Sequence, residues 1–372
     1  AAIAYISSTI APEDDVSNII ATAQLAAYSA AGITGVTPDN LLAVNAQIRK
    51  QQTADGNTDN LDTVADLQAK VTAADNALAY ILSDVAVETG TDDAGTGTLT
   101  EQAQLDAYVD AGVLNVTAEN LLAVNAQIRK QQAADGNTDN LDSVADLQIQ
   151  VTAGNNALAY ILSDVAVETY ALDDVSGNEA VLTTNEQMTA YAEAGVRNVT
   201  ADNLLAVNAQ IRKQQAADGN TDNLDSVADL QAQVVAADNA LAYLVSAVQV
   251  ETFALDDVSG NEAVLTTNEQ LTAYADAGVR DVTEDNLLAV NAQLRLETTV
   301  TNKDSVADIQ TLVGLAESAL DDLVNTVQAN TTAPVSGATG SELLLADQLA
   351  AYEAAGVRDV TEDNLLAVNA QM

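Results

Sequence analysis

One heptapeptide, LLAVNAQ, returns unchanged along this chain and constrains its fold more than any other feature. It begins at Leu41, Leu121, Leu204, Leu287 and Leu365, so that successive copies lie 80, 83, 83 and 78 residues apart. Self-similarity at a nearly fixed period of this size indicates an array of similar modules. An array presents one surface many times, whereas an enzyme needs one unique site, so the repeat favours a structural function.

The chain is strongly acidic, with 55 Asp and Glu against 12 Lys and Arg and a net charge of −43. Such a surface repels nucleic acids and anionic membranes, and we expect neither as a partner. No apolar run is long enough to cross a membrane. The apolar fraction of 48% is placed periodically, so burial offsets chain entropy and an ordered chain is expected.

The chain contains no Cys, His or Trp. Without thiol and imidazole groups, the common zinc sites and catalytic triads cannot form. The sequence therefore predicts that the protein is not an enzyme.

Each repeat opens with a segment that predicts a helix closed by glycine. In the first copy, apolar residues at helical spacing run from Val16 to Leu25 within a helix expected over Asp15 to Ala31. An Ala-Tyr-x-x-Ala-Gly sequence ends this segment in every copy, and a glycine after the last turn satisfies the final carbonyls. The predicted helix stops are Gly32, Gly112, Gly195, Gly278 and Gly356.

A second helix is predicted from the LLAVNAQ segment, with Thr37 as its N-cap and Pro38 at its first position. The spacing turns Asn45 toward the core, where we expect its amide to bond a neighbouring link and fix how the helices dock. The pairs Arg49-Lys50, Arg129-Lys130 and Arg212-Lys213 are placed in the last turn, where cations suit the helix dipole.

A third, longer helix is predicted from about Asp62 to Val87, with Val64, Leu67 and Val71 opening its apolar stripe. Each repeat then has three helices, the shortest plan that closes a helical core. The predicted fold class is all-α: tandem three-helix bundles of about 80 residues in an elongated array. The links between repeats have room for short hairpins, and Thr183 with Glu186 and Thr266 with Glu269 have capping-box spacing.

The variable link after the third helix sets the predicted domain boundaries. The chain divides into a partial repeat, four complete repeats and a further partial repeat, over residues 1–9, 15–87, 100–167, 183–250, 266–327 and 341–372.

A loop before the third helix resembles a calcium loop. Oxygen ligands at alternate positions, followed by a carboxylate at the twelfth, are what calcium loops require. Three repeats meet this spacing, with Asp55, Asn57, Asp59 and Asp66; with Asp135, Asn137, Asp139 and Asp146; and with Asp218, Asn220, Asp222 and Asp229. Calcium is the one cofactor that the sequence suggests, and the fourth repeat lacks the acidic triplet.

The same residues have a second interpretation, in which Asn, Gly, Thr and Asp form a turn and Asp62 or Thr63 caps the third helix. Asp66 then lies in the first helical turn. A weaker cation candidate is the acidic link at Asp173-Asp174 and its copy at Asp256-Asp257. The evenly spaced tyrosines, such as Tyr28 and Tyr80, are interpreted as amphipathic rings at the edge of a small core.

The segment from Ala273 to Asn291, followed by Ser-Val-Ala-Asp-Ile-Gln at Ser305 to Gln310, resembles the GA-like three-helix repeats of giant bacterial surface proteins and adhesins. The resemblance covers nearly the whole chain. It implies a helical-repeat fold and a secreted, cell-surface or matrix location.

These observations predict an extracellular structural protein, a stalk or filament component of a bacterial adhesin, biofilm or matrix fibre. Its expected partners are flanking repeats or neighbouring copies of itself. One alternative is a subunit that polymerises without covalent bonds, its partial end repeats completing each other between chains. Another is a module that binds a host or matrix protein at the cell surface.

Overall fold

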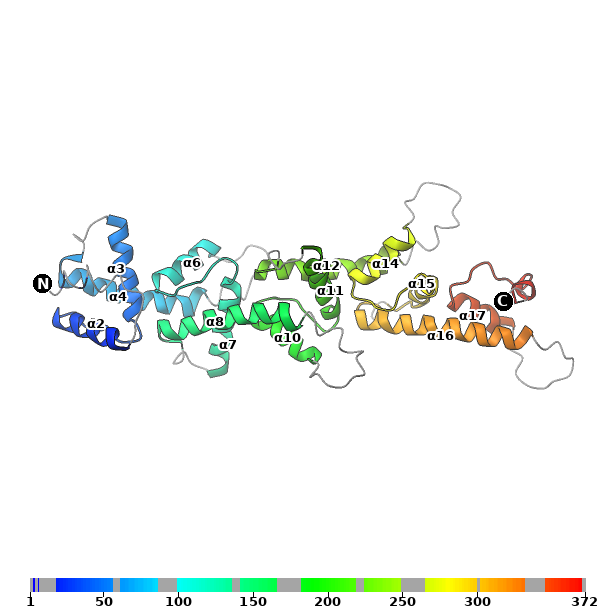
Figure 1. Cartoon of the computed structure of the whole chain (residues 1–372), viewed down its shortest axis with the longest axis horizontal. Helices are drawn as coiled ribbons and strands as arrows, with labels where there is room; N and C mark the ends of the chain where they lie inside the picture. The colour runs from blue at the N-terminus through cyan, green and yellow to red at the C-terminus, as the bar shows by residue number, and fades with distance from the viewer. Residues whose placement is uncertain are drawn as a thin grey trace. The chain divides into compact units, whose positions relative to one another are not determined.

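The computed structural model describes residues 3, 6, 18–55, 61–85, 99–135, 141–165, 182–218, 224–248, 265–299, 302–331 and 345–369. Every regular element in these ranges is a helix and none is a strand, which confirms the all-α class (Figure 1). The links in which hairpins were considered lie outside the described residues.

The same succession of helices follows each sequence repeat, and we number the repeats 1 to 5. The first helices are α2 (Asn18–Ala30), α6 (Glu101–Asp110), α10 (Thr184–Glu193), α14 (Thr267–Asp276) and α17 (Leu345–Ala354). The second helices are α3 (Leu41–Asp55), α7 (Leu121–Asp135), α11 (Leu204–Asp218), α15 (Leu287–Leu296) and α18 (Leu365–Asn369). The third helices are α4 (Val64–Tyr80), α8 (Val144–Tyr160), α12 (Val227–Tyr243) and α16 (Val306–Thr331). A π-helical turn continues three of them, as η3 (Ile81–Val85), η4 (Ile161–Val165) and η6 (Leu244–Val248).

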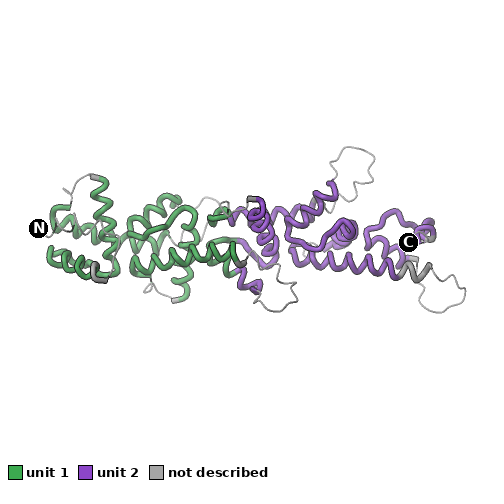
Figure 2. The backbone as a smooth tube through the Cα atoms, in the orientation of Figure 1, with its two compact units in different colours: residues 1–164, 189–197, 224–229 green, residues 165–188, 198–223, 230–372 purple. Residues whose placement is uncertain are grey.

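By their contacts the residues fall into two compact units (Figure 2). Unit 1 comprises residues 1–164, 189–197 and 224–229, and unit 2 comprises residues 165–188, 198–223 and 230–372. Repeats 1 and 2 therefore belong to unit 1 as far as Asp164, repeats 4 and 5 belong to unit 2, and repeat 3 contributes to both.

Residues with positive φ shape the turn between the first and second helix. In repeat 2, Gly112 has φ 74°, and the amide of Val113 donates to the carbonyl of Tyr108 at 2.9 Å. Three residues after this glycine, Asn115 has φ 62°. Asn and Asp adopt this left-handed conformation more readily than other residues with a side chain. The predicted glycine stops are confirmed by positive φ at Gly32, Gly112, Gly195, Gly278 and Gly356.

The second helix begins at Leu41, three residues later than the predicted start at Pro38. The carbonyl of Thr37 accepts from the amide of Leu41 at 3.0 Å, so Thr37 still opens the helical hydrogen bonding. The side chain of Asn40 orders the turn, because its oxygen accepts from the Thr37 amide at 2.9 Å and its nitrogen donates to the Gly35 carbonyl at 2.9 Å. Every repeat has this asparagine, as Asn40, Asn120, Asn203, Asn286 and Asn364.

The predicted caps of the third helices are confirmed. In repeat 1, the hydroxyl of Thr63 accepts from the Asp66 amide, and the Asp66 carboxylate accepts from the Thr63 amide, as a reciprocal capping box. Ser143 and Asp146 form the same box in repeat 2. The predicted boxes of Thr183 with Glu186 and Thr266 with Glu269 also form.

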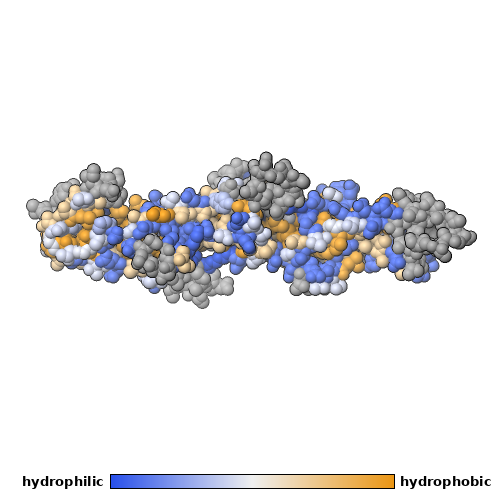
Figure 3. All heavy atoms as spheres, turned by 90° about the horizontal axis from the view of Figure 1, so that it is seen from below, coloured by the Kyte–Doolittle hydropathy of each residue, from blue (hydrophilic) through white to orange (hydrophobic). Residues whose placement is uncertain are grey.

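The apolar stripe of the third helix lies in the core, except for its first residue. In repeat 1, Leu67, Val71 and Leu78 are buried, whereas Val64 is 40% exposed. Other large apolar side chains are also exposed, Leu114 and Ile149 among them, and Figure 3 shows hydrophobic residues interspersed with hydrophilic ones on the face drawn. Scattered apolar residues of this kind are normal for a protein surface.

Candidate functional site: the repeat junction

The first helix of a repeat packs against the preceding repeat. In unit 1, α6 contacts α3, α4 and η3 of repeat 1. In unit 2, α14 contacts α11 and η6, and α17 contacts α15 and α16. We call this contact, together with the polar bonds around it, the repeat junction.

A glutamine and a lysine of the second helix reach across the junction to the end of the next first helix. Gln47 donates to the carbonyl oxygen of Asp110 at 2.6 Å, and Lys50 Nζ lies 2.5 Å from the Asp110 carboxylate. The same partners recur as Gln127 and Lys130 with Glu193 in unit 1, and as Gln210 and Lys213 with Asp276 in unit 2.

This arrangement corrects the interpretation of the Arg-Lys pairs as cations of a last helical turn. Because α3 continues to Asp55, Lys50 lies in its interior and serves the junction. The side chains of Lys50 and Asp110 are 57% and 29% exposed, so solvent screens the pair and it contributes only about 0–1 kcal/mol. The bond from the buried Gln47 satisfies a carbonyl that the end of α6 leaves without a partner. The polar bonds therefore set register more than they add strength.

The glycine that ends each first helix also permits a close approach to the preceding repeat. A Cβ on Gly112 would lie 2.8 Å from the carbonyl oxygen of Leu42 in α3. The corresponding distance is 2.7 Å from Gly195 to Leu122. At Gly32 in repeat 1, no atom lies within 4 Å of that position. The positive φ of Gly32 is sufficient reason for a glycine at that position. At Gly112, both the positive φ and the close packing against α3 require a glycine.

The start of the third helix completes the junction through the backbone. The amide of Val144 donates to the carbonyl oxygen of Asp39, which belongs to repeat 1, at 3.2 Å. The equivalent bonds join Val227 to Glu119 in unit 1 and Val306 to Asp202 in unit 2. These three valines are 1–2% exposed, whereas the equivalent Val64 of repeat 1 is 40% exposed. The junction is thus what buries this valine.

Inside each repeat, a buried amide joins the first and second helices. Asn125 accepts from the hydroxyl of Tyr108 at 2.5 Å and donates to Gln104 at 3.1 Å. The same three residue types bond in repeat 1 as Tyr28, Asn45 and Gln24, in repeat 4 as Tyr274, Asn291 and Gln270, and in repeat 5 as Tyr352, Asn369 and Gln348.

This network confirms the inward asparagine but corrects its partner, which is a helix and not a link. It also corrects the placing of the first tyrosine series at the core edge, because Tyr28 and Tyr108 are 0% exposed. Tyr160 and Tyr243, of the second series, are 38% and 40% exposed and do lie at an edge. Burial raises the pKa of Tyr108 far above its ordinary value, so the phenol remains a neutral donor that holds the helices together.

The proposed calcium ligands are only partly covered by the described residues. Asn57, Asp59, Asn137, Asp139, Asn220 and Asp222 lie outside them, as do both acidic links at Asp173 and Asp256. Asp55, Asp135 and Asp218 are the last residues of α3, α7 and α11. Among the described residues no group of three acidic side chains is placed to hold a metal ion. The calcium sites stay a prediction.

The twelfth ligand of each proposed loop has a structural role that needs no ion. Asp66 and Asp146 complete capping boxes, and Asp229 accepts from the Ser226 hydroxyl at 2.5 Å. Repeat 4 lacks the acidic triplet, yet Asp308 accepts from the Ser305 hydroxyl at 2.6 Å in the same way. Because repeat 4 has this carboxylate without the other calcium ligands, the capping role is favoured.

We therefore expect Asp146→Asn and Asp308→Asn to destabilise the protein equally, by about 1 kcal/mol each, as loss of a helix cap does. Thermal melts with calcium and with a chelator measure both variants. Equal losses under both conditions would support capping. A calcium-induced rise in melting temperature that Asp146→Asn abolishes and Asp308→Asn retains would instead establish the calcium loops.

The caps of the first helices predict a dependence on pH. The backbone amide of Thr266, and then its hydroxyl, lower the pKa of Glu269 below its ordinary value. The stabilisation is therefore present above the unfolded-state pKa of about 4.3 and is lost as the pH falls through the folded-state pKa. We expect Glu269→Gln to lower the melting temperature at pH 7 and to match the parent protein at pH 3.

Glu284→Gln, which removes the same charge from another exposed site, controls for the general relief of repulsion in this acidic chain. Parallel melting curves of Glu269→Gln and Glu284→Gln at every pH would show that the cap does not contribute.

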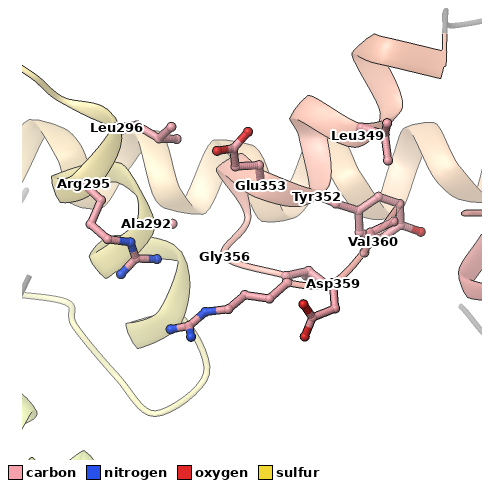
Figure 4. A pocket seen from close by; sticks show the side chains of 11 residues that line it. Ala292, Arg295, Leu296, Leu349, Tyr352, Glu353, Gly356, Asp359 and Val360 are labelled. Atoms are coloured by element: carbon pink, nitrogen blue, oxygen red, sulfur yellow. The ribbon is translucent and has the colours of Figure 1, made fainter. Parts of the chain in front are cut away.

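The junction between repeats 4 and 5 differs from the others. Leu296 and Ala354 replace the lysine and the acid, while Gln293 still donates to the Ala354 carbonyl at 2.8 Å. A cavity of about 630 Å³ opens here, with Arg295 and Leu296 of α15 on one side and Leu349 and Tyr352 of α17 on the other (Figure 4). Burial, and then the charge of Arg358, lower the pKa of Arg295.

Among the described residues, no helix combines the length and the apolar character needed to cross a membrane. Comparison with protein-family models, with curated proteins and with solved structures gives no match. The geometry of the repeat junction is therefore the basis for the proposed function.

Proposed function

We propose that this chain is a structural repeat protein, a stalk or filament component of a bacterial surface adhesin or matrix fibre. In this proposal, three-helix bundles of about 80 residues stack one after another into an elongated array. The observation that carries the proposal is the repeat junction, in which the same glutamine, lysine, glycine and valine positions make the same contacts in both units.

The junction has the property that an array needs. Each repeat uses its second helix to receive the next repeat, and its first and third helices to contact the preceding one. Two different surfaces therefore meet at each step, and such heterologous contacts extend without closing. Coupling between neighbours makes the stability of the array approximately a sum of repeat and junction contributions.

The composition is compatible with a hydrated structural protein. A net charge of −43 keeps the chain soluble and hydrated. The extracellular location rests on the resemblance to surface-protein repeats. Labelling of intact cells by an antibody to the folded chain tests the location, since an internal protein would be labelled only after lysis.

Small-angle X-ray scattering of the purified chain tests the array. A compact globule of 372 residues has a radius of gyration of about 21 Å. We expect a value well above that, a pair-distance distribution with the long tail of a rod, and no change with calcium beyond that produced by magnesium. A radius near 21 Å would refute the stacked array.

A further inference from the structure

Unit 2 contains a groove of about 720 Å³ between α12 and α14, at the junction of repeats 3 and 4. Figure 1 shows these two helices and α11, whose Gln210 also lines the groove. The alanines at 236, 240 and 273 leave space between the helices, because each side chain is a single methyl group. A concave site with a mostly apolar lining and a few polar groups is the usual form of a small-molecule binding site.

One aromatic side chain, Tyr243, lines the groove. It is the last residue of α12 and is 40% exposed, whereas Tyr274 of α14 is buried in the core. The ring of Tyr243 is therefore accessible to a ligand. An aromatic ring of this kind offers an apolar face for packing and a hydroxyl for a hydrogen bond.

The two carboxylates of the lining are already engaged by this chain. Glu269 accepts from the amide of Thr266 at 2.7 Å and from its hydroxyl at 2.8 Å. Asp276 lies 2.7 Å from Lys213 Nζ. These bonds disfavour a small cation as the ligand, and the net charge of −43 repels anions. The groove therefore favours a ligand that is electrically neutral.

The other polar groups of the lining are neutral. Asn239 of α12 and Asn268 of α14 are exposed, and each has an amide that both donates and accepts hydrogen bonds. The hydroxyl of Thr272 donates to the Asn268 carbonyl at 2.8 Å, and its oxygen is able to accept a further bond. Groups that donate and accept, beside an accessible aromatic ring, match a ligand that carries several hydroxyl groups around an apolar face.

We propose that this groove binds a neutral saccharide, with one pyranose ring packed on Tyr243 and its hydroxyls bonded by Asn239, Asn268 and Thr272. A pyranose ring has an apolar C–H face and a rim of hydroxyls, so it uses both kinds of lining group. The groove's volume lies within the range of about 300–1,000 Å³ that is typical of ligand sites. The proposal goes beyond a structural function, and it requires only the contact of repeats 3 and 4 inside unit 2.

The corresponding positions between repeats 1 and 2 differ in their chemistry. Gln102 and Asp106 take the places of Asn268 and Thr272, and the Gln102 amide donates to the Asp106 carboxylate at 2.8 Å. The tyrosine of that junction, Tyr80, is half-buried. We therefore expect no saccharide binding at this junction of unit 1, which provides a control within the same chain.

NMR titration of the full chain with neutral tetrasaccharides tests the proposal. The panel comprises oligomers of glucose, mannose, galactose and N-acetylglucosamine, each raised to about 10 mM. We expect at least one of them to cause saturable shifts of the side-chain amide cross-peaks of Asn239 and Asn268, with no such shift for Gln102. The variants Asn239→Ala, Asn268→Ala and Gln102→Ala assign these cross-peaks by their loss. Unshifted asparagine cross-peaks with every oligomer would overturn the proposal.

Variants of the chain locate the bound saccharide. Tyr243→Ala should weaken binding at least about tenfold, and Asn268→Ala about three- to tenfold through lost hydrogen bonds. Val235→Ala, at a site 55% exposed on α12 and outside the lining, should leave binding unchanged. Equal binding by Tyr243→Ala and Val235→Ala would contradict the proposed site. If Tyr243→Ala unfolds, Ala240→Leu replaces it, because the larger side chain fills the groove and should abolish binding.

Two other ligands separate this proposal from its alternatives. Sorbitol has the hydroxyls of a sugar without the ring, so it should cause no saturable shift. The peptide acetyl-Ala-Leu-Ala-amide is neutral and apolar. Saturable shifts caused by this peptide and by no saccharide would assign the groove to a protein ligand and reject the proposal, as would equal effects of sorbitol and the saccharides. A rod-like scattering profile together with no saccharide binding would reject this proposal and leave the stacked array standing.

Discussion

Gly112→Ala should destabilise unit 1 by about 2–4 kcal/mol, because the added methyl group combines backbone strain with a clash against backbone atoms. The alanine would have to adopt the glycine's φ of 74°, and its Cβ would lie 2.8 Å from the carbonyl oxygen of Leu42. That oxygen belongs to the backbone of α3, which cannot turn aside as a flexible side chain would. Thermal or urea unfolding of the purified variant measures the loss.

Gly32→Ala is the matched control because it separates backbone strain from the clash. Gly32 has a similar φ of 81° at the same turn of repeat 1, and no atom lies within 4 Å of the added Cβ. Only the backbone strain remains, so this variant should lose about 1 kcal/mol. Equal losses at the two glycines would mean that the close approach between repeats is not present in solution.

Asn125→Leu should cost about 2–5 kcal/mol, the second large effect, although leucine has a similar size and is more apolar. The substitution leaves the Tyr108 hydroxyl and the Gln104 carbonyl oxygen without their partner, and each such buried group costs about 1–3 kcal/mol. The free energy of unfolding from urea denaturation measures the effect.

Tyr108→Phe controls for the network. Alone it removes one hydrogen bond, so about 1–2 kcal/mol should be lost. Combined with Asn125→Leu, it removes the hydroxyl that the leucine would strand, and the double variant should lose less than the sum of the single variants. Additive losses would show that the tyrosine and the asparagine do not interact.

Much of the local structure follows from residues close together in the sequence. Thr63 and Asp66 are three positions apart, and Gly112 follows its helix directly, so capping chemistry predicts both. The apolar stripe of the third helix is equally local, and its period of three to four residues predicts a buried face. The helices, their caps and the glycine stops of the first helices are therefore accessible from the sequence.

The repeat junction was not accessible in the same way. Gln47 and Lys50 meet Asp110 across 63 and 60 positions of the chain, and no local pattern pairs them. The sequence favours Lys50 as the cation of a last helical turn, because no local signal marks the end of α3 at Asp55. Comparison of the repeats gives one signal for this pairing. At the last junction the lysine and the acid are both replaced, by Leu296 and Ala354.

The hydrogen bonds of Asn40 are a second feature that local sequence does not predict. Its side chain bonds Thr37 and Gly35 within the turn and Asp75 on the third helix. Asn40 lies directly before the helix that begins at Leu41, and the nearby Thr37 already predicts an N-cap, so local sequence gives the asparagine no separate role. Its bond to Asp75 depends on the packing of the third helix, which local sequence does not specify.

Hydrogen exchange at the first amide of each third helix is a direct test of the repeat junction. Such amides have no acceptor within their own helix and ordinarily exchange quickly. Stacked repeats predict that the amides of Val144, Val227 and Val306, which donate to the preceding repeat, exchange at least about a hundredfold more slowly than that of Val64. Similar fast exchange at all four valines would contradict the junction and the array built on it.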